Sequence, residues 1–278
     1  MKAIYDEVSL GLSKRMTRRY STSFSLGILF LDRSIRTPIY NIYGFVRLAD
    51  EIVDSFHGYD QEKLLSKLKA DTIEAIEMGI STNPVLHSFQ EVVRQYQIDW
   101  DLIDTFLQSM EMDLDQSKYD MKSYEKYILG SAEVVGLMCL KVFTNGDEQL
   151  YRKLRPTAKK LGSAFQKVNF LRDAQSDFKE LGRTYFPGVN LNQFTEENKK
   201  EIEKEIEEEF ALALEGIKQL PSSSRKGVYL AYFYYYRLFK KIKRLSPQNV
   251  LKTRTRIPNG QKLVLMFQSL VRHELNMM

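Results

Sequence analysis

One predicted helix, ending near residue 181, carries a line of polar side chains through an otherwise apolar sequence. Each step of four residues turns a side chain by only about 40° around the helix axis, so residues spaced in this way share one face. The polar residues of this first stripe are Gln166, Asn169, Asp173 and Asp177. Phe165 lies on one side of the stripe, and Phe170 and Ala174 lie on the other. A solvated face would be polar across its width, so this arrangement predicts a water-filled cleft inside a helical protein.

A second helix, predicted to begin at Pro38 and to reach about Phe56, carries a similar stripe. Its members fall at i, i+4, i+7 and i+11, within about 30° of one line on the helix. The second stripe consists of Tyr43, Arg47, Asp50 and Asp54. Apolar residues such as Phe45 and Ala49 form the adjoining face. Two long helices therefore each present a pair of aspartates, and we expect the two stripes to face each other across one cavity.

Two aspartate pairs on facing helices suit the binding of divalent cations together with a diphosphate. Mg²⁺ prefers hard oxygen ligands and is usually held by one or two carboxylates plus substrate phosphates. Asn169 could add a neutral oxygen ligand. Arg47 and Arg172 lie beside the stripes, where each could meet phosphate oxygens or pair with an aspartate when the site is empty. A diphosphate whose oxygens bind metal ions is a good leaving group, so the pattern favours an ionisation reaction.

The aspartates also have a simpler interpretation. A DxxxD pair is common on solvated helix surfaces and would be weak support by itself. Two pairs, each with an arginine nearby and each bordered by apolar residues, favour the functional interpretation. The histidines, His57, His87 and His273, are scattered and show no metal-ligand spacing. The sequence contains neither a glycine-rich phosphate loop nor a dinucleotide-binding fingerprint.

The rest of the chain predicts an all-α fold in a single domain, residues 1–278. Prolines and glycines are scarce, at 7 and 14, and no segment alternates convincingly between polar and apolar residues. We expect a helical bundle of roughly ten helices around a central cavity. The expected ranges are 3–19, 38–56, 60–78, 84–96, 100–116, 121–144, 147–181, 196–217, 224–245 and 261–276. Residues 20–30 are expected to be a loop that runs into a helix or an extended turn, and Pro156 could divide the helix that contains it.

Cysteine usage and hydropathy limit the cellular setting. Cys139 is the single cysteine, so no disulfide can form within the chain, which fits a reducing cytoplasm. The first residues carry charges throughout and lack the apolar core of a signal peptide. No stretch approaches about 18 apolar residues, so no membrane-spanning helix is expected. Within the apolar segment 121–144, Gly130 and Gly136 favour close helix packing over room for a substrate tail.

Three segments together resemble motifs of the squalene and phytoene synthases. YSTSFS at 20–25 is similar to the amino-terminal serine–phenylalanine motif of that family. YGFVRLADEIVD at 43–54 and NFLRDAQSDFKELGRTYFP at 169–187 are similar to its two aspartate-rich motifs. The matching pieces cover most of the chain in the family's order. Many members have two adjacent aspartates where this chain has Asp50 and Glu51, but residue 51 points away from the line through 50 and 54, so we expect the site to be retained.

The resemblance implies an isoprenoid synthase-like fold with a central active-site cavity. It implies Mg²⁺-dependent joining of two identical prenyl diphosphates through a cyclopropyl intermediate. The implied ligands of two or three Mg²⁺ ions, which Mn²⁺ could replace, are Asp50, Asp54, Asn169, Asp173 and Asp177. The residues to which the resemblance assigns catalysis are these four aspartates with Tyr43, Arg47 and Arg172. The implied substrate-binding residues are Ser21, Ser23, Phe24, Tyr127, Gln166, Asn169, Tyr235, Arg254 and Arg256. One of the last two arginines is expected to meet phosphate, and Arg256 is the better match.

Family members differ in prenyl chain length and in whether NADPH reduces the intermediate. Ile28 lies one turn past Phe24, where the resemblance places a cavity wall, and isoleucine is smaller than an aromatic residue. We therefore expect room for a C20 tail and the product phytoene, formed from two geranylgeranyl diphosphates without NADPH. That product would make downstream carotenoid enzymes possible partners. The alternative is a C30 product, squalene or dehydrosqualene, formed from farnesyl diphosphate.

A helical binding protein is the alternative from a different class. The net charge is +5, but residues 199–210 are acidic and residues 237–256 are strongly basic. A basic segment of this kind could attract an anionic membrane or RNA. Its aromatic residues are not spaced as base-stacking platforms, so nucleic acid is not an expected partner. Because the substrate and product would be lipids, we expect a cytoplasmic protein whose basic segment also rests peripherally on membrane lipid.

Overall fold

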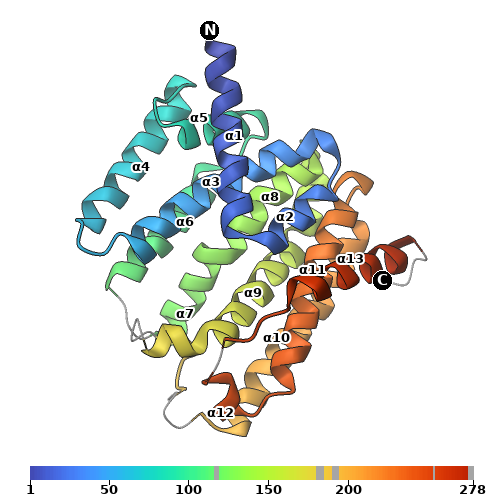
Figure 1. The fold of residues 1–278 in the computed structure, drawn as a ribbon. Coiled ribbons are helices and arrows are strands. Elements are labelled where there is room, and N and C mark those ends of the chain that lie inside the picture. Colours follow the sequence, from blue (N-terminus) through green and yellow to red (C-terminus); the bar gives the residue numbers. More distant parts are fainter. Residues whose placement is uncertain (116–118, 180–184, 190–193, 253, 275–278) are drawn as a thin grey trace.

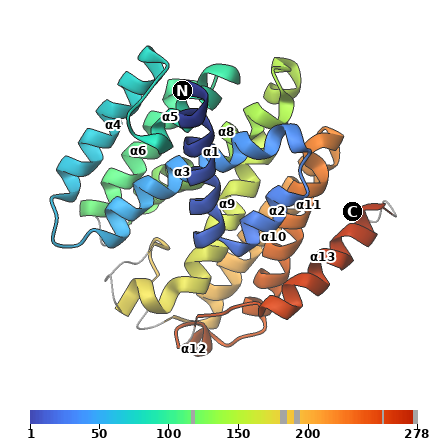
Figure 2. The ribbon, with the colours of Figure 1, turned by 45° about the horizontal axis from the view of Figure 1, so that its top comes forward.

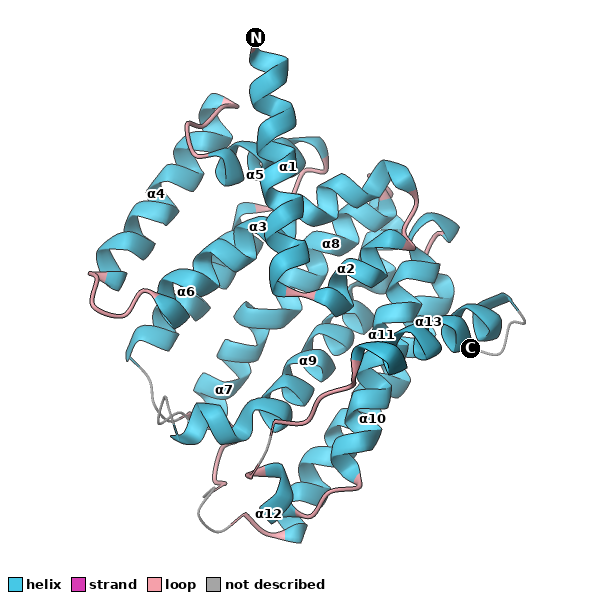
Figure 3. Ribbon diagram, in the orientation of Figure 1, coloured by secondary structure: helices cyan, strands magenta, loops and turns pink. Residues whose placement is uncertain are grey.

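Every regular element that the structure, a computed structural model, describes is a helix (Figures 1 and 3). The structure describes residues 1–115, 119–179, 185–189, 194–252 and 254–274, without the side chains of residues 115, 176–179, 259, 263 and 274. The elements are α1 (Lys2–Tyr20), α2 (Thr22–Leu29), α3 (Arg33–Ser55), α4 (Gln61–Met78), α5 (Pro84–Gln95), α6 (Trp100–Asp115), α7 (Met121–Ile128), the π-helix η1 (Leu129–Glu133), α8 (Val134–Thr144), α9 (Glu148–Lys179), α10 (Glu196–Gln219), α11 (Ser222–Lys243), α12 (Pro247–Val250) and α13 (Asn259–Glu274). The predicted all-α fold class is confirmed.

The two helices that carry the polar stripes belong to two neighbouring groups of helices. α3 packs against α1, α5, α6 and α8, whereas α9 packs against α8, η1, α10 and α11. α8 contacts both α3 and α9 and so joins the two groups. Figures 1 and 2 show α4, α5 and α6 on one flank of the molecule and α10, α11 and α13 on the other. α2 lies against α11, beside the end of α1.

Side-chain caps determine where two of the long helices begin. Asp32 Oδ1 accepts a hydrogen bond from the backbone N–H of Ser34 at 2.9 Å, so α3 begins well before the proline predicted to start it. Pro38 therefore lies inside α3. Thr195 and Asn198 form a reciprocal capping box at the start of α10.

Three further stretches refine or correct the sequence-based prediction. Residues 22–29 form the helix α2, because the Ser21 hydroxyl accepts a hydrogen bond from the backbone N–H of Phe24 at 3.2 Å and caps it. α9 continues as one helix through Pro156, which does not divide it. The short helix α12 is missing from the prediction because four residues are too few to show a helical period.

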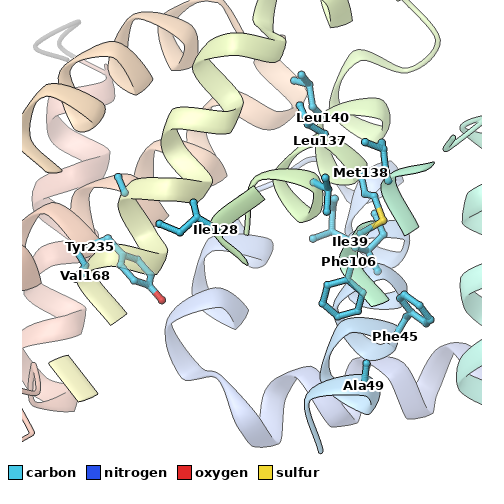
Figure 4. Close-up of a cluster of buried hydrophobic side chains, with 14 of the residues drawn as sticks. Ile39, Phe45, Ala49, Phe106, Ile128, Leu137, Met138, Leu140, Val168 and Tyr235 are labelled. Carbon is cyan, nitrogen blue, oxygen red and sulfur yellow. The ribbon is translucent and has the colours of Figure 1, made fainter. Parts of the chain in front are cut away.

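An aromatic cluster fixes the rotation of α3. Phe45 of α3 stacks on Phe89 of α5, with ring centroids 4.0 Å apart and planes 1° apart. Phe106 of α6 lies 5.7 Å from Phe45, and none of the three rings is exposed. Figure 4 shows Phe45 and Phe106 close to Met138 of α8. Because this face of α3 is buried, the face that carries Asp50 turns towards the other group of helices.

The two glycines of the segment 121–144 have different surroundings. Gly130 lies in η1, where an added Cβ would stand 2.6 Å from the carbonyl oxygen of Thr105 in α6. Close packing of α6 on η1 therefore requires a glycine there, as predicted. At Gly136 the nearest atom to an added Cβ is the carbonyl oxygen of Ala158, at 3.4 Å, and Gly136 lines a cavity. The packing prediction is thus correct for Gly130, whereas Gly136 leaves space.

The segment Met121–Thr144 is long and apolar enough, by length and composition, to cross a membrane. The expectation that no segment would reach this limit was therefore too strict. However, 61% of its most apolar window is buried inside the protein, and it packs against α3, α6 and α9. This burial is typical of a core helix.

Candidate functional site

A cavity of about 1480 Å³ lies between α2, α3, α8, α9, α10 and α11. Every predicted site residue whose side chain is described lines this cavity. These residues are Ser21, Ser23, Phe24, Tyr43, Arg47, Asp50, Asp54, Tyr127, Gln166, Asn169, Arg172, Asp173, Tyr235, Arg254 and Arg256. The side chain of Asp177 lies outside the described residues. As far as their side chains are described, both polar stripes face the same cavity.

The cavity lining changes from apolar to charged along both long helices. On α3 it passes from Ile39 to Asp54, and on α9 it passes from Leu154 to Asp173. The described part of the apolar lining also includes Ile28 of α2. An elongated apolar space that leads to carboxylates and arginines suits an amphiphile with an anionic head group.

Asp50 lies where negative charge accumulates. Burial raises the pKa of Asp50 to about 7; the guanidinium of Arg47 opposes this shift, and the carboxylates of Asp54 and Asp113 add to it. The side chain keeps 30% of its accessible surface, so an ion can reach it. A divalent cation bound here would stabilise the charged form of Asp50.

Arg47 is held on three sides at the edge of the cavity. Its guanidinium pairs with Glu51, and its Nη1 lies 3.7 Å from Asp50 Oδ2. The guanidinium carbon lies 4.3 Å from the centroid of the Tyr20 ring. The side chain of Glu51 is 12% exposed and is not among the described residues that line the cavity. Glu51 therefore orients the arginine and faces away from the line of Asp50.

On α9, two arginines hold the carboxylate of Asp173. Arg172 Nε donates to Asp173 Oδ1 at 3.0 Å, and Arg254 Nε lies 2.6 Å from the same oxygen. Arg254 is thus the arginine of the segment after α12 that reaches the stripe. The backbone carbonyl of Arg256 accepts a hydrogen bond from Lys241 at 2.7 Å, although Arg256 also lines the cavity.

A lysine joins these arginines at the basic edge of the cavity. Lys262 of α13 donates to Thr22 Oγ1 of α2 at 2.6 Å, and its Nζ lies 5.7 Å from the centroid of the Tyr234 ring. Burial and the positive charge of Arg172 lower the pKa of Lys262. A bound anion would stabilise the charged form of Lys262. Lys262 also ties the last described helix to the start of α2.

Aromatic rings form one wall between the stripes. Tyr235 of α11 stacks on Phe165 of α9 at 4.1 Å and donates to Asn169 Oδ1 at 3.3 Å. Phe24 of α2 lies 5.9 Å from Tyr235 and 5.7 Å from Tyr43. Of the five consecutive aromatic residues 232–236, only two, at 234 and 235, are among the described lining residues.

Ser21 links the amino-terminal motif to α3. Besides capping α2, it forms a hydrogen bond with Tyr43. Burial raises the pKa of Tyr43 to about 12, and the negative charge of Asp50 acts in the same direction. Tyr43 is therefore a neutral hydroxyl that can donate a hydrogen bond to an anion.

The sequence analysis missed Asp113 of α6, which also lines the cavity. Its side chain is buried and accepts hydrogen bonds from two tyrosines. The signal available in the sequence was weak: a single carboxylate between Met112 and Leu114 on a predicted helix, with no partner at helical spacing.

Asp6, His87 and Glu91 form a second acidic cluster away from the cavity, with ligand atoms within 4.8 Å of one another. The hydrogen bonds of His87 explain it without a metal ion. Nδ1 accepts from the backbone N–H of Ser81 at 3.4 Å, so Nε2 carries the proton and donates to Asp6 at 2.8 Å. Lys2 also pairs with Asp6 at 2.8 Å. We assign this cluster a structural role at the start of α1.

The acidic and basic segments of the sequence partly neutralise each other. Glu207 of α10 pairs with Lys240 at 2.9 Å and with Lys243 at 2.8 Å, both on α11. Lys241 is engaged by the segment after α12. Part of the basic surface expected to attract membrane or RNA is thus occupied by contacts within the chain.

The arrangement of helices around this cavity is that of the all-α isoprenoid synthase fold. The sequence profile of squalene/phytoene synthases matches residues 17–261. The chain therefore belongs to the squalene/phytoene synthase family of prenyltransferases, which join prenyl diphosphates head to head.

Relatives within this family carry several different names. The chain is 25% identical over 282 residues to a phytoene synthase of Arthrospira platensis, covering 92% of this chain and 90% of that protein. It is 26% identical over 198 residues to a 4,4'-diapophytoene synthase of Staphylococcus haemolyticus, covering 69% of this chain and 66% of that protein. A dehydrosqualene synthase crystal structure superposes with a TM-score of 0.84 at 20% identity, over 97% of this chain and 98% of that chain.

Proposed function

We propose that this protein is a phytoene synthase of carotenoid biosynthesis, which condenses two geranylgeranyl diphosphates head to head and releases diphosphate. The observation that carries the proposal is the cavity of about 1480 Å³ whose lining changes from apolar to charged along both α3 and α9. Prenyl diphosphates have the same division into a long apolar tail and an anionic head. The match to phytoene synthases over most of the chain supports this substrate class.

The residues of the cavity fit a cluster of Mg²⁺ ions. Burial, together with the negative charges of Asp54 and Asp113, raises the pKa of Asp50, and hard oxygen ligands are the donors that Mg²⁺ prefers. Asp50, Asp54, Asn169 and Asp173, together with Asp177, would hold the ions. Bound there, the ions would act as Lewis acids that make diphosphate a better leaving group.

The chain's own cations would bind the diphosphate oxygens. Arg47, Arg172, Arg254 and Lys262 line the cavity near the aspartates. Arg172 and Arg254 both pair with Asp173, and a bound diphosphate would give them a second anionic partner. The hydroxyl of Tyr43 would donate a further hydrogen bond.

The aromatic wall would protect the reacting carbons. Phe24, Phe165 and Tyr235 pack against one another and line the cavity beside the two stripes. Ring faces stabilise positive charge without forming a bond to it, and their bulk excludes water that would otherwise capture a carbocation.

Ile28 supports the C20 chain length. It is 3% exposed, belongs to the cavity wall and leaves more space than an aromatic side chain would. The alternative is a C30 product from two farnesyl diphosphates, a class represented by the diapophytoene and dehydrosqualene synthases among the relatives.

We also propose a cytoplasmic protein that contacts membrane lipid peripherally. α13 turns Val264, Phe267 and Val271 outwards, with Phe267 64% exposed. Apolar side chains at this helical spacing can enter a lipid interface. If wild type sediments with anionic vesicles and Phe267→Ser does not, the contact is supported. Full binding by that variant would contradict it.

Product identification tests the function. The purified protein is incubated with Mg²⁺ and either C15 or C20 diphosphate, with and without NADPH, and extracted lipids are analysed by mass spectrometry. Phytoene formed from the C20 substrate without NADPH is the expected result. Turnover of only the C15 substrate would assign the protein to the C30 synthases, and release of a prenyl alcohol alone would contradict condensation.

A further inference from the structure

A carboxylate outside both stripes lies buried in the wall of the cavity. Asp113 of α6 is 7% exposed and lines the cavity. The hydroxyl of Tyr127 donates to its Oδ2 at 2.8 Å, and the hydroxyl of Tyr119 donates to its Oδ1 at 3.3 Å. Each oxygen of this carboxylate therefore accepts a hydrogen bond from a phenol.

Stacked rings hold the two phenols in place over this carboxylate. Tyr185 stacks on Phe170 of α9, with centroids 4.1 Å apart and planes 9° apart. Tyr127 and Tyr119 each lie 5.4 Å from the Tyr185 ring. The hydroxyl of Tyr127 therefore has little freedom to turn away from Asp113. Because its proton is donated to Asp113, the lone pairs of the Tyr127 oxygen point away from that carboxylate.

This arrangement answers a chemical problem of the proposed function, on which the inference rests. When diphosphate leaves a prenyl chain, positive charge develops on carbon inside the cavity. A bare carboxylate in contact with that carbon would form a C–O bond to it and leave an ester. A carboxylate covered by two phenols still exerts its electrostatic field through a medium of low polarity, while both oxygens are occupied by hydrogen bonds.

We propose that Asp113 is a positioning residue that stabilises positive charge in the cavity through the hydroxyls of Tyr127 and Tyr119, without contacting the charged carbon. The proposal assigns a function to a charged group that neither aspartate stripe contains. It also assigns Tyr127 a role that depends on its hydroxyl and not only on its ring.

Binding of a charged probe tests the proposal without turnover. Geranylgeranyl dimethylamine, protonated at pH 7.5, is compared with its neutral isostere, in which carbon replaces nitrogen, in the presence of Mg²⁺ and inorganic diphosphate. Calorimetry gives the ratio of the two dissociation constants. We expect wild type to prefer the ammonium probe and Asp113→Asn, which keeps the shape and removes the charge, to lose about tenfold of that preference.

Two further variants separate this role from a structural one. Tyr127→Phe keeps the stacked ring and is expected to lose part of the same preference. Tyr124→Phe is the matched control, because Tyr124 lies on the same helix and its buried hydroxyl has no hydrogen-bond partner among the described residues. The control should bind both probes as wild type does. An unchanged preference in Asp113→Asn would overturn the proposal, as would equal weakening of both probes.

Kinetics distinguish the failure of this inference from the failure of the proposed function. In the enzyme that forms product, Asp113→Asn is expected to lower kcat about tenfold to a hundredfold, with KM and the Mg²⁺ requirement within about threefold of wild type. A raised Mg²⁺ requirement would instead identify Asp113 as a metal ligand. If wild type forms no condensed product, the proposed function fails, whereas the probe measurement, repeated with the C15 amine pair, still decides the role of Asp113.

Discussion

Arg254 reaches Asp173 from a segment 81 positions further along the chain, and its Nε lies 2.6 Å from Asp173 Oδ1. The arginine thus neutralises a carboxylate that the proposed function assigns to Mg²⁺. Metal and arginine would compete for this carboxylate until a diphosphate arrives to bind both.

Removal of this arginine should have opposite effects on the two ligands. In Arg254→Ala, Asp173 loses one cation, so we expect Mg²⁺ in the absence of substrate to bind about two- to fivefold more tightly. The KM for prenyl diphosphate should rise about tenfold, because a phosphate contact is lost. Calorimetry and steady-state kinetics measure the two effects. Lys240→Ala is the control: Lys240 pairs with Glu207, and its replacement should change neither value.

Asp50 should make the metal-free protein less stable at alkaline pH. Its pKa rises from 3.8 to about 7 on folding, so the folded state holds the proton more tightly than the unfolded state does. Stability is therefore lost as pH rises from about 4 to about 7. At pH 8 we expect Asp50→Asn to unfold at a higher urea concentration than wild type. Its free energy of unfolding should be larger by about 1–2 kcal/mol after allowance for solvent screening, and the two proteins should differ little at pH 4.

The urea titrations are done in EDTA, so that no metal ion binds the carboxylate. Asp54→Asn serves as the comparison, because Asp54 is exposed and its replacement should alter stability much less. Equal stability of wild type and Asp50→Asn at pH 8 would contradict the burial of charge at this site.

The two glycines of the central segment should respond differently to a methyl group. Gly130→Ala would place Cβ 2.6 Å from the Thr105 carbonyl oxygen, so α6 and η1 must separate, at a cost of about 1–3 kcal/mol. Gly136→Ala meets its nearest atom at 3.4 Å and should cost less than about 1 kcal/mol. Thermal and chemical unfolding of both variants checks the difference, and equal losses would show that the approach of α6 does not depend on Gly130.

Enlargement of Ile28 should shorten the preferred substrate. In Ile28→Phe the added ring occupies part of the cavity, so we expect turnover of the C20 relative to the C15 diphosphate to fall about tenfold. Leu29→Phe is the matched control, because Leu29 follows on the same helix, is 40% exposed and is not among the described lining residues. A similar fall in both variants would point to distortion of α2 instead of loss of space.

Much of the fold and of the candidate site was accessible from the sequence because both depend on helical periodicity. The stripe from Tyr43 to Asp54 repeats at the spacing of the helix itself, so the pattern contains its own geometry. The start of α3 was predicted too late because a cap by Asp32 depends on one hydrogen bond and leaves no periodic signal. Asp113 was missed for a related reason: its partners Tyr119 and Tyr127 lie beyond the end of its helix, and the stacking that aligns them involves Tyr185, much further along the chain.

The hydrogen bond from Lys262 to Thr22 joins residues 240 positions apart at the edge of the cavity. During synthesis on a ribosome, Thr22 is exposed early, whereas Lys262 emerges only after α11 has been made. The nascent protein must therefore keep a large apolar cavity open at this edge for most of its translation, a condition that favours association with other hydrophobic surfaces. The cavity is therefore closed at this edge only once α13 has folded onto the start of α2.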